Sequence, residues 1–321
     1  MSEPLVSVVI PTRDRPQLVS RAVQSVSQQT LPSIEILVIV DGPDENTVKE
    51  LEKLNITNLK IIPLPKNVGP ASARNIGVKQ AQGTWIAFLD DDDEWLPQKL
   101  ELQLEAANKS QFKFPVVSSR FIALTSKGEF TWPRRLLAAD EPLSDYLFAR
   151  SSIFGGEGFI QTSTLFTKKE LLLKVPFREN KYKHEDWEWL LQVNNLEDVK
   201  VEFVPEATAY WHSDIGRKRL SNISDWQYSL EWIRSIKHLV TPKAYSSFIM
   251  IIVSHEASKV GDWKAFWMLL QEAIKLGRPR LIDYLLYMGI WLVPQDLRQQ
   301  FRALNNRSKQ MFNMLQSRNA S

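Results

Sequence analysis

Five consecutive carboxylates, Asp90–Glu94, are the strongest chemical signal in the sequence. They directly follow Trp85–Leu89, an apolar stretch typical of a buried strand, and ligands of open α/β sheets bind beyond the carboxyl ends of such strands. Because side chains alternate along an extended chain, we expect Asp90 and Asp92 to project to the same side. Converging carboxylates repel each other unless a cation lies between them, and their hard oxygens favour Mg²⁺ or Mn²⁺. The alternative is an acidic turn in which Asp93 caps the next helix.

Two other predicted strands also end in polar residues: Val6–Ile10 is followed by Pro11-Thr12-Arg13, and Glu35–Val40 by Asp41-Gly42. Since the carboxyl ends of parallel strands meet at one edge of a sheet, we expect Thr12, Asp41 and Asp90 to line one crevice. The carboxylate of Asp41 could accept hydrogen bonds from a base or a ribose. Alternatively, Asp41 is a turn residue before a glycine.

Arg74 lies in the second turn of a helix predicted over Pro70–Gln82. The N-terminus of this helix would face the same crevice, where a guanidinium suits a diphosphate. An ordinary solvent-exposed helix arginine is the alternative.

Four motifs occur in order along the chain: Val6-Ser7-Val8-Val9-Ile10-Pro11-Thr12, Ile39-Val40-Asp41-Gly42, Ala73-Arg74-Asn75-Ile76-Gly77 and Gly83-Thr84-Trp85-Ile86-Ala87-Phe88-Leu89-Asp90-Asp91-Asp92-Asp93. With these motifs the chain resembles family 2 glycosyltransferases of the GT-A fold over roughly residues 4–215. The resemblance implies an enzyme that transfers a sugar from a nucleotide-diphosphate donor with inversion at the anomeric carbon. It also implies a divalent metal ion, Mn²⁺ or Mg²⁺, as cofactor.

The resemblance also assigns roles to individual residues. It implies that the donor is bound by Pro11, Thr12, Arg13, Asp41, Arg74, Asp90 and Asp91. Among these, Pro11, Thr12 and Asp41 would hold the nucleoside. The metal ion would be bound by Asp92 and Asp90, and His212 is a further candidate ligand because neutral imidazole suits Mn²⁺. A packed histidine beside Tyr210 and Trp211 is the alternative.

A second acidic motif, within His184–Leu191, resembles the family's Glu-Asp pair at the start of a helix. A helix N-terminus favours an ionised carboxylate, and inverting transfer needs one base to take the proton of the acceptor hydroxyl. By similarity Asp186 is the base and Glu185 the alternative, although both could simply cap the helix. The glycine-rich stretch 155–163 faces the acceptor in this family.

The elements that must position these residues alternate between strand and helix over the first hundred residues, which predicts an α/β fold with a mostly parallel sheet. The predicted strands are Leu5–Ile10, Glu35–Val40, Leu59–Leu64, Trp85–Leu89, Val116–Ala123, Phe159–Thr167, Val199–Val204 and Thr208–Trp211. The predicted helices are Pro16–Gln29, Val48–Leu54, Pro70–Gln82, Lys168–Leu173 and Glu185–Asn195, followed by Trp226–Leu239, Lys243–Val260, Trp263–Leu276 and Leu281–Val293. We therefore expect a catalytic domain over 1–222 and a helical domain over 223–321.

The composition narrows the choice of function. The chain has 321 residues, a net charge of +3 and no cysteine, which argues against a dedicated nucleic-acid binder and excludes disulfides and thiolate metal sites. It lacks a signal-peptide pattern and any run of 18 apolar residues, so we expect a cytoplasmic protein. After residue 292 the tail carries five basic residues and one acid, so an apolar helix followed by a basic one could contact an anionic membrane face. A helical core with a solvated basic end is the alternative.

Other functions fit the sequence less well. The polymerising members of the family carry a Gln-x-x-Arg-Trp motif and membrane spans, which are not found here, so transfer of one sugar per binding event is expected. The acceptor could be a glycan, a lipid-linked glycan or a protein. A nucleotidyltransferase would normally show a glycine in the loop after the first strand, where this chain has none. A protein that binds nucleotide sugars without transferring them is the remaining alternative.

Overall fold

The computed structural model describes residues 4–126, 128–153, 155–181, 183–212 and 224–293. The chain divides into two compact units. The first consists of Met1–Leu147 and Phe154–Asn222, and the second of Phe148–Ile153 and Ile223–Ser321. Every candidate site residue identified from the sequence belongs to the first unit.

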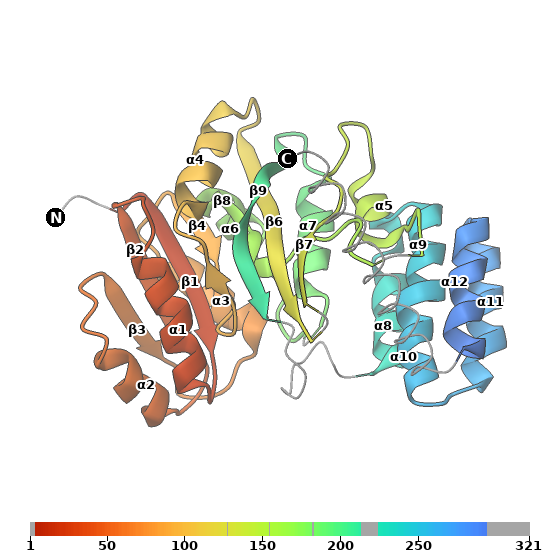
Figure 1. Ribbon diagram of the computed structural model, residues 1–321, viewed down its shortest axis with the longest axis horizontal. Helices are drawn as coiled ribbons and strands as arrows, with labels where there is room; N and C mark the ends of the chain where they lie inside the picture. The colour runs from red at the N-terminus through yellow and green to blue at the C-terminus, as the bar shows by residue number, and fades with distance from the viewer. Residues whose placement is uncertain (1–3, 127, 154, 182, 213–223, 294–321) are drawn as a thin grey trace, which may run out of the picture. The chain divides into compact units, whose positions relative to one another are not determined.

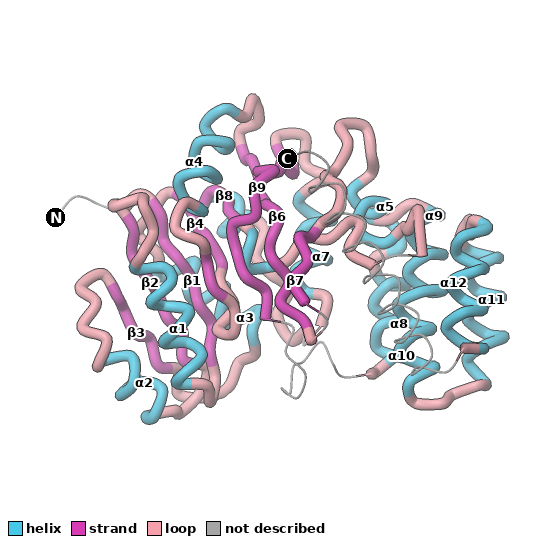
Figure 2. The backbone as a smooth tube through the Cα atoms, viewed as in Figure 1, coloured by secondary structure: helices cyan, strands magenta, loops and turns pink. Residues whose placement is uncertain are grey.

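A mixed sheet of nine strands runs through the described part of the first unit, in the order β3-β2-β1-β4-β8-β6-β9-β5 with β7 paired to β6 (Figures 1 and 2). The strands are β1 (Val6–Thr12), β2 (Ile34–Val40), β3 (Leu59–Pro63), β4 (Trp85–Phe88), β5 (Glu94–Trp95), β6 (Phe114–Thr125), β7 (Gly128–Trp132), β8 (Phe166–Lys168) and β9 (Val199–His212). The first four strands pair in parallel, as expected, whereas beyond β4 antiparallel pairs are mixed with the parallel pair β6–β9. The strands β1, β2 and β4, at whose ends Thr12, Asp41 and Asp90 lie, are therefore parallel neighbours that end at the same edge.

The helices of the first unit are α1 (Pro16–Ser27), α2 (Glu45–Glu52), α3 (Pro70–Gln80), α4 (Lys99–Lys109), α5 (Leu143–Phe148), α6 (Lys169–Lys174) and α7 (Glu185–Val193). The predicted helices are confirmed with ends that differ by a few residues. The short elements α5, β5 and β7 were not predicted, because none is long enough to show a clear period, and α4 was expected only as the helix that follows the acidic run.

One predicted strand is wrong over most of its length. Instead of a strand over Phe159–Thr167, the chain makes a 3₁₀ turn, η1 (Thr162–Thr164), before the short β8. The Thr164 hydroxyl donates to the Gln161 carbonyl at 2.7 Å and the amide of Leu165 to the Thr162 carbonyl at 3.0 Å. These local hydrogen bonds compete with a ladder, as hydroxyl side chains often do. By contrast, the two strands predicted over 199–211 are one strand, β9.

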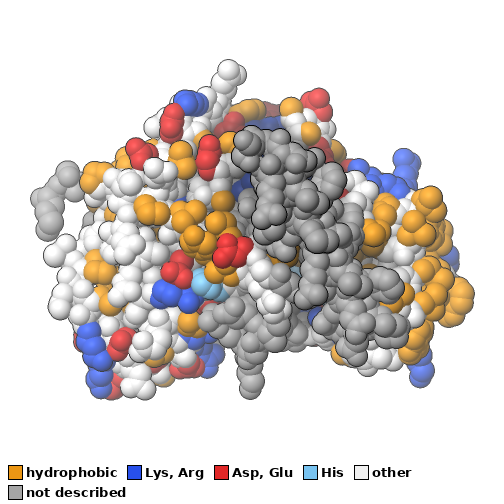
Figure 3. All heavy atoms as spheres, viewed as in Figure 1, with side chains coloured by type: hydrophobic (Ala, Val, Ile, Leu, Met, Phe, Trp, Pro, Cys, Tyr) orange, Lys and Arg blue, Asp and Glu red, His pale blue; other side chains and the backbone are white. Residues whose placement is uncertain are grey.

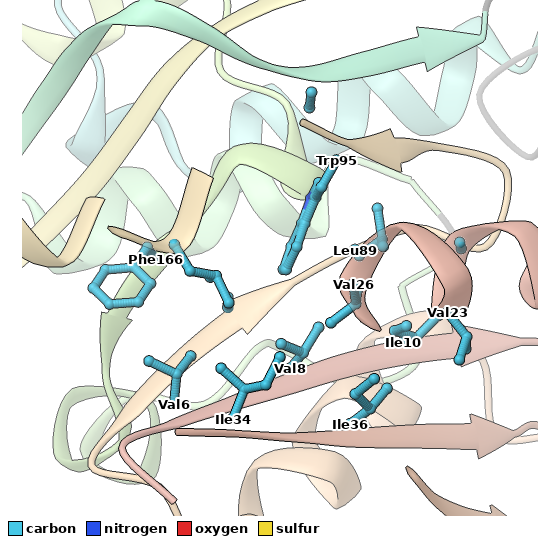
Figure 4. Close-up of a cluster of buried hydrophobic side chains, with 14 of the residues drawn as sticks. Val6, Val8, Ile10, Val23, Val26, Ile34, Ile36, Leu89, Trp95 and Phe166 are labelled. Carbon is cyan, nitrogen blue, oxygen red and sulfur yellow. The ribbon is translucent and has the colours of Figure 1, made fainter. Parts of the chain in front are cut away.

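The core beneath the carboxyl edge of the parallel strands is continuous and apolar. Figure 4 shows Val8 and Ile10 of β1 beside Leu89 and Trp95, and all four are buried. Helix α3 packs so closely on this sheet that only glycine fits at position 77. A Cβ added at Gly77 would lie 2.3 Å from a methyl carbon of Val9. The helix that carries Arg74 is therefore fixed against β1.

The second unit contains only helical elements among its described residues: α8 (Trp226–Ser235), η3 (Lys237–Leu239), α9 (Pro242–Ser247), a π-helical turn η4 (Phe248–Val253), α10 (Ser254–Lys259), α11 (Lys264–Leu276) and α12 (Leu281–Leu292). The helix predicted over 243–260 is thus interrupted by the π-helical turn, where the Ser254 hydroxyl donates to the Ile249 carbonyl at 3.0 Å. In the described part of the chain, no helix meets the length and hydropathy that crossing a bilayer requires.

Candidate active site

Residues 90–93 of the acidic run form a turn, the acidic turn, and Glu94 begins β5. The amide of Asp93 donates to the carbonyl of Asp90 at 3.1 Å, so the expected alternation of side chains does not apply. Asp93 does not cap the next helix either; its buried carboxylate accepts from the hydroxyl of Ser163 at 2.7 Å and from the Gln161 amide. The N-cap of α4 is Gln98. The turn therefore sends its carboxylates toward several different elements.

Asp91 connects the turn to the end of β1. Its carboxylate accepts from the Thr12 hydroxyl and from Nη1 of Arg15, each at 2.8 Å. The same Arg15 nitrogen lies 3.8 Å from a carboxylate oxygen of Asp92. Burial raises the pKa of Asp91 to about 6, against the opposing influence of Arg15 and Thr12.

Arg74 joins the two acidic motifs. Its Nη2 lies 2.8 Å from Oδ1 of Asp90, and its Nη1 lies 2.9 Å from Oε1 of Glu185, 111 residues away in the chain. The guanidinium is buried, at 5% exposure, and its carbon lies 5.9 Å from the ring centre of Phe177. Burial alone would lower the pKa of Arg74, but the two carboxylates raise it above its usual value. Arg74 is thus a buried bridge within the site and not a solvent-exposed helix residue.

Asp186 is held by two donors from different elements. Its Oδ2 accepts from the Thr162 hydroxyl at 2.9 Å, and its Oδ1 accepts from the amide of Trp187 at 2.8 Å. Burial and repulsion from Glu185 raise the pKa of Asp186 to about 6, although Arg74 and the Thr162 hydroxyl act in the other direction. A carboxylate with a pKa near 6 is ionised at neutral pH and is a stronger base than an ordinary aspartate.

The start of α7 has an unusual backbone. Its N-cap, His184, has a left-handed φ of 66°, and its ring stacks on Trp187 with centroids 5.2 Å apart. Burial, with help from Lys183 and Lys181, lowers the pKa of His184 to about 3, so the ring is neutral. Glu185 and Asp186 follow in the first turn of α7, where the helix dipole favours negative charge.

The predicted donor residues at the strand ends occupy different surroundings. Thr12 and Asp41 are buried, and the Asp41 oxygens accept from the amides of Val68 and Gly69 at 2.7 and 2.9 Å. Asp41 therefore braces the turn before α3, while lone pairs on its oxygens remain for further donors. Pro11 is half-buried at the end of β1, whereas the side chain of Arg13 is half exposed and lies 3.4 Å from Asp14.

His212 does not form a ligand group with Asp90 and Asp92. Its Nε2 lies 2.7 Å from Oε1 of Glu94, which also pairs with Arg21 at 3.0 Å. Among the described residues, no three His, Cys, Asp or Glu side chains are arranged to hold a metal ion. One or two carboxylates completed by phosphate oxygens and water are the usual surroundings of Mg²⁺, so the oxygen donors of the turn fit such an ion.

Two contributors to the site were missed from the sequence. Arg15 pairs with Asp91, and Arg21 of α1 donates to the Asp92 carbonyl at 2.9 Å. Neither stands in a motif, and neither an arginine at a helix N-cap, as Arg15 is, nor one within an amphipathic helix shows in the local sequence which residue it will pair with. Thr162 lies within the stretch expected to face the acceptor, but its contact with Asp186 was not foreseen.

The chain is similar to known glycosyltransferases. Residues 7–175, more than half of the chain, match the model of glycosyl transferase family 2. The amylovoran biosynthesis glycosyltransferase AmsB of Erwinia amylovora is 25% identical over 251 residues, which cover 75% of this chain and 80% of that protein. WfgD of Escherichia coli, a UDP-Glc:alpha-D-GlcNAc-diphosphoundecaprenol beta-1,3-glucosyltransferase, is 32% identical over 137 residues, covering 42% of this chain and 54% of WfgD.

Two solved structures share the fold. TarS 1-349 of S. aureus, in complex with UDP-GlcNAc, superposes with a TM-score of 0.54 at 19% identity and covers 94% of this chain and 80% of its own. The mannosyltransferase PcManGT of Pyrobaculum calidifontis, in complex with GDP-Man and Mn²⁺, gives a TM-score of 0.55 at 15% identity and covers 94% and 84%. At these identities the likeness concerns the fold, which is that of the GT-A glycosyltransferases.

Proposed function

Since the chain belongs to glycosyl transferase family 2 and is a glycosyltransferase, we propose that residues 1–222 form its catalytic domain and act by an inverting, non-processive mechanism. The donor is a nucleoside-diphosphate sugar and the acceptor is a hydroxyl of a glycan, of a lipid-linked glycan or of a protein. The observation that carries the proposal is the Arg74 bridge, because it brings the acidic turn and the start of α7 to one site.

In the proposed reaction, the acceptor oxygen attacks the anomeric carbon of the donor sugar. A carbon–oxygen bond forms there, the bond from the anomeric carbon to the diphosphate oxygen breaks, and the nucleoside diphosphate leaves with the bonding electrons. The proton of the acceptor hydroxyl passes to Asp186. Glu185 is the weaker candidate for the base, because its carboxylate is paired with the guanidinium of Arg74.

On the donor side, Pro11, Thr12 and Asp41 would hold the nucleoside. Arg74 and its partner Asp90 would face the ribose and diphosphate. Asp91, which is held by Thr12 and Arg15, would lie on the donor side as well, and Arg13 would approach from the exposed side. Asp92, with Asp90, would hold a divalent cation, and His212 could join only by leaving Glu94. When bound, such an ion neutralises the charge that develops on the departing diphosphate.

Thermal unfolding with UDP-glucose, UDP-GlcNAc or GDP-mannose, each with and without Mn²⁺, tests the donor and the metal together. A donor at about a hundred times its Kd stabilises by about 2.7 kcal/mol, which raises the melting temperature by several degrees. We expect this rise for at least one donor, larger with Mn²⁺, and we expect Asp92→Asn to remove the Mn²⁺ increment. No shift with any of the three donors would count against the proposed donor class.

We also propose that the C-terminal helices rest on an anionic membrane surface, which would suit a lipid-linked acceptor. The outer face of α12 carries an exposed apolar stripe, Leu281, Leu285, Met288 and Leu292, and Trp267 of α11 is 66% exposed. Apolar side chains also gather over α11 and α12 in Figure 3. The basic tail that follows α12 in the sequence lies outside the described residues, but its charge complements anionic lipid.

Flotation with vesicles of phosphatidylglycerol and phosphatidylcholine tests the membrane contact. We expect the chain to float at low salt and Leu285→Asp with Leu292→Asp to prevent this, because the stripe would then carry two charges into the interface. Leu173→Asp on α6 is the matched control, since Leu173 is 50% exposed in the other unit. Absence of flotation, or self-association through the stripe in size-exclusion chromatography, would contradict the membrane proposal.

A further inference from the structure

The 3₁₀ turn η1 lies between the two acidic motifs and contacts both. Thr162 donates its hydroxyl to Asp186, and it is 5% exposed. The next residue, Ser163, accepts from the amide of Asp90 at 3.0 Å and donates to Asp93. One short turn thus holds the proposed base and the acidic turn of the donor side.

The position of η1 is fixed by residues that do not belong to either motif. The amide of Gln103, a fully buried residue of α4, donates to the Thr164 carbonyl at 2.6 Å. The indole of Trp95 donates to the Ser163 carbonyl at 2.8 Å. Because these anchors come from the core, the Thr162 hydroxyl is pre-positioned and does not merely follow Asp186.

From these contacts we infer that Thr162 is a positioning residue for Asp186, which holds its carboxylate in the orientation and the ionised form that proton transfer requires. This inference rests on the proposed function. The hydroxyl uses one lone pair of Oδ2, and the other remains for the proton of the acceptor. A hydrogen bond to a carboxylate favours its charged form.

The charges that face Asp186 make this hydrogen bond consequential. Glu185, in the same turn of α7, repels the ionised carboxylate, and burial disfavours it further. Arg74 of α3 attracts it, but its guanidinium is shared between Asp90 and Glu185. Without the Thr162 hydroxyl, the carboxylate would keep the hydrogen bond that the Trp187 amide donates to Oδ1.

The test compares Thr162→Val, which removes the hydroxyl at nearly constant volume, with Thr162→Ser, which keeps it. The readout is release of nucleoside diphosphate from UDP-glucose, UDP-GlcNAc or GDP-mannose, with water as acceptor, over pH 5–9. Hydrogen bonds to charged groups contribute enough to move a pKa by about one unit. We therefore expect Thr162→Val to displace the acidic limb of the pH profile upward by about one pH unit, which lowers kcat about fivefold at pH 6, and to leave KM for the donor unchanged. Thr162→Ser should restore both kcat at pH 6 and the position of the acidic limb.

Thr164→Val is the matched control in the same turn. The Thr164 hydroxyl contacts the Gln161 carbonyl and the Ser118 hydroxyl instead of the base. This variant should lose stability without displacing the limb of the pH profile. A Thr162→Val enzyme with an unchanged limb and kcat, or a Thr162→Ser enzyme as impaired as the valine variant, would overturn the inference. Failure of the proposed function is distinguishable, because the natural protein would then release no nucleoside diphosphate from any of the three donors. Normal turnover by Asp186→Asn would instead show that Asp186 is not the base.

Discussion

Asp186→Asn is expected to lower the rate of transfer by about a thousandfold while nucleotide-sugar binding is retained. General-base catalysis contributes roughly 10²–10⁴ in rate, and an amide cannot accept the proton of the acceptor hydroxyl. The amide side chain can still accept from the Trp187 amide and donate to the Thr162 hydroxyl, so the local structure should persist. The measurement is kcat for nucleoside diphosphate release beside donor affinity from thermal shift.

The pH dependence follows from the same residue. Because the pKa of Asp186 is raised to about 6, the base is protonated and inactive below that pH, and activity should rise through pH 6 to a plateau near pH 7. For stability the sign is opposite. In the unfolded chain this aspartate ionises near pH 4, whereas in the native state it stays protonated up to about pH 6. The native state therefore binds more protons than the unfolded state between these pH values, and the free energy of unfolding falls as pH rises from about 4 to 6. At pH 7 the Asn variant should therefore be at least as stable as the natural protein.

Glu185→Gln separates the two candidate bases. Glu185 touches Arg74, so its neutral variant should weaken the bridge and raise KM for the donor, with a smaller loss of kcat than Asp186→Asn. Normal turnover by Asp186→Asn together with an inactive Glu185→Gln would show that the base is Glu185. A melting temperature well below that of the natural protein would mean that Asp186→Asn acts through folding.

The sequence predicts those site residues whose positions depend only on the order of the strands in the sheet. Thr12, Asp41 and Asp90 lie at the ends of β1, β2 and β4 in the parallel half of the sheet, so their common edge follows from topology. The partners of Arg74 could not be predicted in this way. They lie 16 and 111 residues away, and the choice depends on how α3 and α7 pack in three dimensions.

Local backbone conformation explains the other misses. Beyond β1 the chain adopts a left-handed φ of 54° at Asp14, which breaks the alternation of an extended strand. Arg15 and not Arg13 then pairs with the acidic turn. In the same way, alternation predicted a shared side for Asp90 and Asp92, whereas the chain turns at this point. Periodicity describes regular elements, and the residues around this site lie mostly where those elements end.

Arg74→Met is expected to lower the free energy of unfolding by about 3–5 kcal/mol and to abolish donor binding. Removing one partner of a buried ion pair costs this much because the remaining charges stay buried without compensation. Here two carboxylates, Asp90 and Glu185, would lose their cation at once. Chemical denaturation measures the stability, and thermal shift with the nucleotide sugars measures the donor site.

Two further variants distinguish a bridge from a simple positive charge. Arg74→Lys keeps the charge, but an ammonium lacks the planar fork that contacts both carboxylates, so part of the stability and most of the donor affinity should still be lost. Lys109→Met breaks an exposed ion pair with Glu105 and should change stability by less than about 1 kcal/mol. If Arg74→Met were as mild as Lys109→Met, the guanidinium would not hold the two acidic motifs together, and the proposed site would lose its central contact.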